Sequence, residues 1–154
     1  MSAVVTPARP TTAHRSFLAF DFGIKRVGVA GGNSLTRSAS PLRTIAVTGD
    51  PRFAEIAALI AEWQPDRLVV GLPLHADGTP HEMTARARRF AHQLEGRTGL
   101  PVVQVDERHT TELARSALQA DGRGGREHRA LRDAVAAQLI LQAYLDTPDD
   151  PRPA

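Results

Sequence analysis

The chain has 154 residues and no cysteine, so it forms neither a disulfide framework nor a thiolate metal site. Its net charge is only +2, and one globular domain is expected from its length and its ordinary hydrophobic share of 42%. No stretch approaches the roughly 20 apolar residues that span a bilayer, and residues 1–15 lack the apolar run of a signal peptide. We therefore expect a cytoplasmic protein that does not engage membranes.

The basic residues are almost all arginine, since Lys25 is the one lysine among 19 Lys and Arg residues. Arginine side chains match phosphate oxygens two at a time, which favours a nucleic-acid partner. A GC-rich genome that favours arginine codons explains the same composition. Arginine content alone is therefore weak support for nucleic-acid binding.

Between two expected disordered tails, residues 1–15 and 147–154, the pattern of apolar residues predicts alternating strands and helices. The expected strands are residues 16–22, 26–31, 43–47, 67–71 and 101–105, and the expected helices are residues 51–63, 79–97, 110–120 and 127–146. A meander followed by strand–helix units predicts an α/β domain over residues 16–146, with helices packed on a mixed five-stranded sheet.

Two acidic groups stand where strands end. Asp21 closes the first strand, and the fifth strand runs directly into Asp106 and Glu107. If both strands point the same way, these carboxylates lie at the same edge of the sheet, where ligands bind in such folds.

A third carboxylate, Asp133, lies on the last expected helix. It shares a helical face with Ala136, Ala137, Ile140 and Tyr144, so that face packs on the sheet and Asp133 points inward. An inward carboxylate needs a partner. Three converging acids repel one another, and a divalent cation relieves that repulsion. Oxygen ligands favour Mg²⁺ or Mn²⁺, and two such ions about 4 Å apart support phosphodiester hydrolysis.

Each acid also has a purely structural interpretation. Asp21 could begin a turn, and Asp106 or Glu107 could cap the helix that follows. Asp133 could pair with a buried arginine. That all three acids have only a structural role, and share one edge by chance, is less expected than that any one of them does.

Basic and hydroxyl groups accompany the acids. Lys25 and Arg26 follow Asp21 in its turn, and Arg108 and Thr110 follow Glu107. These are candidate nucleic-acid contacts, although Thr110 or Thr111 could equally be a helix cap. Arg86, Arg88 and Arg89 lie on the helix at residues 79–97, where a solvated face is the simpler interpretation.

Four blocks make the chain resemble the YqgF/RuvX family, the Holliday-junction-resolvase-like proteins described as pre-16S ribosomal RNA nucleases. The blocks are FLAFDFGIKRVGVA (17–30), RLVVGLPLHADGT (67–79) with TARARRFA (84–91), VDERHTTELARSAL (105–118) and RDAVAAQLIL (132–141). The resemblance implies an RNase H-like fold in which Asp21, Glu107 and Asp133 are the catalytic, metal-binding set. It also implies maturation of the 5′ end of small-subunit ribosomal RNA and action on structured or branched nucleic acid, with precursor ribosomal particles as partners.

The chain departs from the family at Leu131, where members often carry lysine two residues before the last aspartate. Arg132 or Arg129 is then left to supply the basic group near the third ligand.

Three other functions compete with RNA processing. One is a Holliday junction resolvase-like endonuclease on branched DNA, which normally needs two sites related by a two-fold axis. No segment indicates a dimer interface, so a monomer or weak dimer acting on RNA is favoured. Another is a nucleic-acid-binding ribosome-assembly factor without catalysis. The last, an ATP phosphotransferase of the actin, Hsp70 and sugar-kinase type, would need a second domain that 154 residues do not supply.

Overall fold

The computed structural model describes residues 15–75, 77–106 and 126–146, with the side chains of the last helix described from residue 131. The strands are β1 (Ser16–Phe22), β2 (Val27–Asn33), β3 (Ser38–Ile45), β4 (Arg67–Leu72) and β5 (Val102–Asp106), and the helices are α1 (Asp50–Trp63), α2 (Glu82–Thr98) and α4 (Arg126–Asp146). The expected helix at residues 110–120 lies outside the described residues, as do the expected tails except for Arg15. The backbone N–H of Arg15 donates to Ser34 Oγ at 2.8 Å.

The five strands form one mixed sheet in the order β3-β2-β1-β4-β5. β1, β2 and β3 form an antiparallel meander, whereas β4 is parallel to β1 and β5 is parallel to β4. The mixed five-stranded sheet flanked by helices is confirmed, and it is the RNase H-like arrangement that the resemblance implies.

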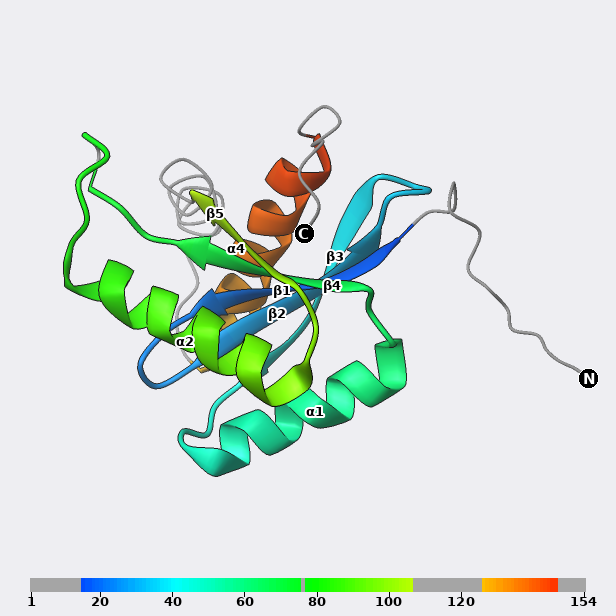
Figure 1. Cartoon of the computed structure of the whole chain (residues 1–154), viewed down its shortest axis with the longest axis horizontal. Coiled ribbons are helices and arrows are strands. Elements are labelled where there is room, and N and C mark those ends of the chain that lie inside the picture. The colour runs from blue at the N-terminus through cyan, green and yellow to red at the C-terminus, as the bar shows by residue number, and fades with distance from the viewer. Residues whose placement is uncertain (1–14, 76, 107–125, 147–154) are drawn as a thin grey trace, which may run out of the picture.

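Helices cover both faces of the sheet (Figure 1). α1 and α2 lie on one face and α4 lies on the other. β1 is central, so its alternate side chains enter two cores: Leu18 and Phe20 pack under α1 and α2, and Phe17 and Ala19 pack under α4. Because β1 is buried on both faces, its residues 17–20 are all apolar, with no alternation of polar side chains.

The prediction for the third strand was wrong in its bounds, because β3 spans Ser38–Ile45 and not residues 43–47. The serines and Pro41 at its start look like a loop in the sequence. β3 is an edge strand with a register shift in its pairing with β2, and such a strand tolerates proline and exposed polar residues.

The second helix also begins later than the expected residue 79. His81 caps α2, because its Nδ1 accepts a hydrogen bond from the backbone N–H of Met83 at 3.1 Å. Thr84 Oγ1 accepts from the backbone N–H of His81 at 2.9 Å, which completes a capping box. No helix in the described part of the chain is long and apolar enough to span a bilayer.

Candidate active site

The carboxyl ends of β1, β4 and β5 meet at one edge of the sheet (Figure 1). Asp21 is the penultimate residue of β1 and is half-buried. Asp106 is the last residue of β5, where it is exposed and paired in register with Leu72 of β4. The first and fifth strands therefore point the same way, which is the condition on which the sequence placed their carboxylates at one edge. Glu107 follows β5 directly and lies outside the described residues.

A close approach of α4 to the sheet brings Asp133 to the same edge. Gly28 of β2 pairs with Asp21 of β1, and a Cβ on Gly28 would lie only 1.9 Å from the backbone oxygen of Asp133. The helix can therefore sit directly on the strand only because Gly28 has no side chain. Asp21 and Asp133 consequently line one pocket of about 270 Å³, together with Lys25 and Arg26 of the intervening turn.

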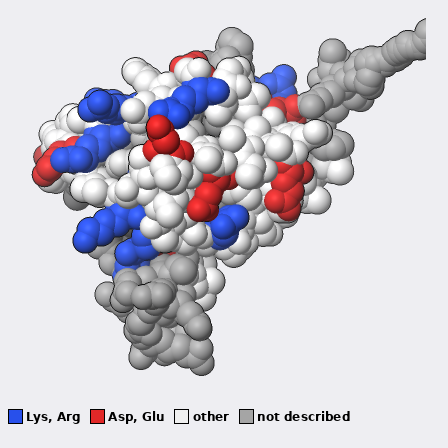
Figure 2. Space-filling model, turned by 90° about the horizontal axis from the view of Figure 1, so that it is seen from below, with Lys and Arg blue, Asp and Glu red and all other residues white. Residues whose placement is uncertain are grey.

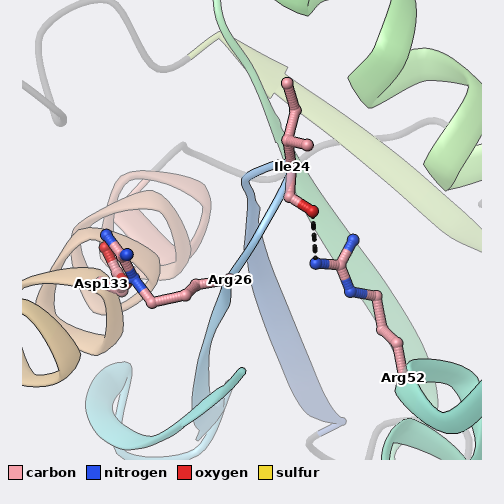
Figure 3. A network of polar contacts seen from close by, with 4 residues as sticks. All are labelled: Ile24, Arg26, Arg52 and Asp133. Atoms are coloured by element: carbon pink, nitrogen blue, oxygen red, sulfur yellow. Dashed lines mark hydrogen bonds and ion pairs between the residues drawn. The ribbon is translucent and has the colours of Figure 1, made fainter. Parts of the chain in front are cut away.

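Asp133 is held by an arginine. Nε of Arg26 donates to Oδ2 of Asp133 at 2.6 Å, with the two side chains 35% and 17% exposed (Figure 3). The sequence left open an ion pair between Asp133 and a buried arginine. The pair exists, but Arg26 is only partly buried and reaches the site from the β1–β2 turn. Asp133 therefore pairs with an arginine and still lines the pocket.

A second arginine, which the sequence analysis missed, anchors the other side of this turn. Arg52 of α1 is only 5% exposed, and burial lowers the pKa of its guanidinium. Its Nη2 donates to the backbone oxygen of Ile24 at 2.9 Å (Figure 3). Its Nε donates to the backbone oxygen of Val47, also at 2.9 Å. The available signal was its spacing, because Arg52 shares the buried face of α1 with Ile56 and Leu59.

We expect Arg52→Met to destabilise the protein by about 1.5–3 kcal/mol, because the variant loses two part-buried hydrogen bonds from a charged donor to backbone carbonyls. Urea unfolding measures this loss, and amide hydrogen exchange in the turn should become faster. Arg43→Met is the matched control, since Arg43 pairs with Glu55 across 3.3 Å on the surface and should cost at most about 1 kcal/mol. Equal losses in the two variants would contradict an anchoring role for Arg52.

Only some of the residues predicted to contact nucleic acid lie in the described part of the chain. Lys25 is exposed in the turn, and Arg132 is half-buried on α4 beside Asp133. Leu131, at the position of the family lysine, is 48% exposed. Arg108 and Thr110 lie outside the described residues.

Two carboxylates in one pocket fit the oxygen-rich environment that Mg²⁺ and Mn²⁺ prefer. Within the described residues, no cluster of three acidic or histidine side chains completes a metal site. The expected third ligand, Glu107, directly follows the strand whose end lies at this edge. The described part of the site thus offers a partial oxygen ligand set beside two basic side chains.

Known proteins resemble this chain along most of its length. The family model for RuvX, described as Holliday junction resolvase, matches residues 15–147. A protein of Burkholderia multivorans named "Putative pre-16S rRNA nuclease" is 50% identical over 149 residues, which cover 96% of this chain and 97% of that protein. A protein of Burkholderia vietnamiensis with the same name is 52% identical over 136 residues, covering 88% of this chain and 91% of its own.

Among solved structures, Thermus thermophilus RuvC in complex with a Holliday junction substrate has 19% identity and a TM-score of 0.48, with 86% of this chain and 97% of that chain covered. A likeness this distant says nothing about shared chemistry. The family model and the two Burkholderia relatives are decisive, and the chain belongs to the RuvX family.

Proposed function

We propose that this protein is a divalent-metal-dependent nuclease that hydrolyses phosphodiester bonds in structured RNA and processes the 5′ end of pre-16S ribosomal RNA. The observation that carries the proposal is the pocket in which Asp21 and Asp133 face the same space beside Lys25 and Arg26. Membership of the RuvX family and the name of the Burkholderia relatives support the reaction and the substrate.

In the proposed site, Asp21, Glu107 and Asp133 hold Mg²⁺ or Mn²⁺. Such ions, when bound, activate a water and stabilise the leaving oxygen of a phosphodiester. Asp21 is positioned by the end of β1, and Asp133 by the packing of α4 on Gly28. Lys25, Arg26, Arg108, Thr110 and Arg132 are the proposed nucleic-acid contacts.

The charge distribution supports a nucleic-acid substrate at this end of the molecule. Figure 2 shows Lys and Arg side chains gathered toward the left, which is the end where β1, β4 and β5 finish in Figure 1. Most of the Asp and Glu side chains visible on this face lie nearer its middle and right. Exposed basic residues include Lys25, in the turn after β1, and Arg86 and Arg89, on α2.

Aromatic packing ties α2 to the turn that lines the pocket. The rings of Phe22 and Phe90 have centroids 4.9 Å apart, so the turn of α2 that carries Arg89 lies beside the end of β1. A phosphate backbone passing the pocket could therefore meet basic groups from two elements.

The direct test is cleavage of a precursor RNA that carries the 16S leader, with Mg²⁺, with Mn²⁺ and with a chelator. We expect cleavage near the mature 5′ end with either metal and none with the chelator. An Asp21→Asn protein purified in parallel excludes contaminating ribonuclease. Cleavage that survives the chelator would contradict the metal-dependent mechanism.

The family description favours a second candidate, an endonuclease on branched DNA. A four-way DNA junction assayed under the same conditions distinguishes the two candidates, because we expect the RNA to be cut much faster. Preferential cutting of the junction would replace the RNA proposal. Tight RNA binding without cleavage would instead indicate a ribosome-assembly factor.

The proposal also covers partners and location. It includes a cytoplasmic location and action on precursor ribosomal particles, as a monomer or weak dimer. Sedimentation of the protein with such particles in a cell extract, and not with mature subunits, is the expected result.

A further inference from the structure

Arg26 uses only part of its hydrogen-bonding capacity to hold Asp133. Its Nε donates to one carboxylate oxygen, Oδ2, at 2.6 Å. Within the described stretches of the chain, Nη1 and Nη2 of Arg26 make no hydrogen bond, and the side chain is 35% exposed. Among the residues that the structure describes, two of the three nitrogen atoms of this guanidinium therefore have no partner, and the side chain lies on the wall of the pocket (Figure 3).

The shape of the guanidinium decides what Nη1 and Nη2 can bind. The group is planar, and its five N–H donors have fixed directions. Once Nε is fixed on Asp133, Nη1 and Nη2 can adjust little without breaking that bond. Two donors held side by side in this way match two oxygens of a phosphate group.

Asp133 gains from the same contact. The backbone at Asp133 is fixed by the packing of α4 on Gly28, but its side chain can still rotate. The bond from Arg26 engages Oδ2 and so restricts that rotation, with Asp133 in the pocket wall. Ligating carboxylates in metal sites are commonly oriented by hydrogen bonds of this kind.

The anchoring of the turn makes this arrangement rigid. Arg26 follows Ile24 by two residues, and Arg52 fixes the backbone oxygen of Ile24 from α1. The turn is therefore tied to α1 through Ile24 and to α4 through Arg26. A guanidinium held in this way loses less freedom on binding a ligand than a free surface arginine would.

We propose that Arg26 is a two-sided residue: its Nε orients the carboxylate of Asp133, while its Nη1 and Nη2 bind the oxygens of a phosphate in the nucleic-acid backbone. This inference rests on the proposed function, because it takes the substrate phosphate into the pocket beside Asp133. Lys25, its exposed neighbour, has no described partner and differs from Arg26 in supplying charge alone. In this proposal Lys25 attracts the substrate by its charge, and Arg26 positions the phosphate.

The test uses the full chain with Arg26→Lys and Arg26→Gln, and Lys25→Gln as the matched control from the same turn. Calorimetry measures Mn²⁺ affinity without RNA, and fluorescence anisotropy measures RNA affinity in chelator at several salt concentrations. We expect both Arg26 variants to lose about 10- to 100-fold in Mn²⁺ affinity, because neither replacement places an N–H donor where Nε of Arg26 now orients Oδ2 of Asp133. Arg26→Gln should also weaken RNA binding and lower the slope of log affinity against log salt by about one.

Lys25→Gln should weaken RNA binding in the same way but leave Mn²⁺ affinity unchanged. Arg26→Lys should keep most of the RNA affinity, because it keeps the charge, and this variant separates orientation of Asp133 from attraction of RNA. Circular dichroism should show every variant folded.

Three results would overturn the inference. Tighter Mn²⁺ binding in Arg26→Gln would mean that Arg26 competes with the metal for Asp133. Mn²⁺ affinity unchanged in both Arg26 variants would remove the orienting role, and RNA affinity unchanged in Arg26→Gln would remove the phosphate contact. If the unaltered protein cleaves RNA and any of these results is found, the inference alone fails. If the unaltered protein binds neither Mn²⁺ nor RNA, the proposed function fails with it.

Discussion

We expect Asp133→Asn to lower the rate of RNA cleavage by roughly 1,000-fold, which corresponds to about 4 kcal/mol of transition-state stabilisation. Asparagine has nearly the same shape and can still accept the hydrogen bond from Nε of Arg26. It lacks the negative charge that holds a divalent cation, so the loss should fall on metal binding and catalysis while the fold persists. Asp21→Asn should have a similar effect, because Asp21 lines the same pocket. Single-turnover cleavage at saturating enzyme measures both.

Asp146→Asn is the matched control for this prediction. Asp146 is the last residue of α4, is exposed, and accepts a hydrogen bond from Nε2 of Gln142 at 3.1 Å. The variant removes the same charge from the same helix and should cleave at the rate of the unaltered protein. Cleavage by Asp133→Asn within a few-fold of that rate, or an equal loss in Asp146→Asn, would contradict the assignment of Asp133.

The largest expected effect on stability comes from Gly28→Ala, at about 3 kcal/mol or more. The added Cβ would lie 1.9 Å from the backbone oxygen of Asp133 and 2.3 Å from its carbonyl carbon. Because these atoms are helix backbone, no side chain can rotate away and α4 itself must move. Both the free energy of unfolding and the cleavage rate should fall, since Asp133 moves with the helix. Chemical denaturation and the cleavage assay measure the two effects.

Gly96→Ala is the control, with an effect of opposite sign. Gly96 lies in α2, and a Cβ there would meet nothing within 4 Å. Alanine is the better helix former, so this variant should be more stable by about 0.5–1 kcal/mol. If Gly28→Ala is as well tolerated as Gly96→Ala, α4 does not depend on the bare backbone of β2 for its position.

The features predictable from the sequence were those that depend on local periodicity. The apolar run that ends at Asp21 predicted the first strand, and the stripe on the last helix correctly predicted that Asp133 lies on a partly buried face. The common direction of β1 and β5 was only a condition in the sequence, and the structure meets it because both strands are parallel to β4.

The contacts that organise the site depend on distant parts of the chain, and one sequence could not reveal them. Arg26 and Asp133 are 107 residues apart, and their pairing appears only once α4 lies across β2. The same packing gives Gly28 its role, since the sequence shows only a glycine in a strand. Arg52 was missed because an arginine at the start of a helix is usually solvated, whereas here it meets two backbone oxygens.

The central claim is that Asp21 and Asp133 belong to one divalent-cation site at the carboxyl edge of the sheet. A crystal structure of the protein soaked with Mn²⁺, with the ion located by its anomalous scattering, tests this claim most directly. We predict a peak in the pocket between β1 and α4, with carboxylate oxygens of Asp21, Asp133 and Glu107 as ligands at roughly 2.1 Å. A peak ligated elsewhere, or a pocket that stays empty at saturating Mn²⁺ while Arg26 keeps its bond to Asp133, would contradict it.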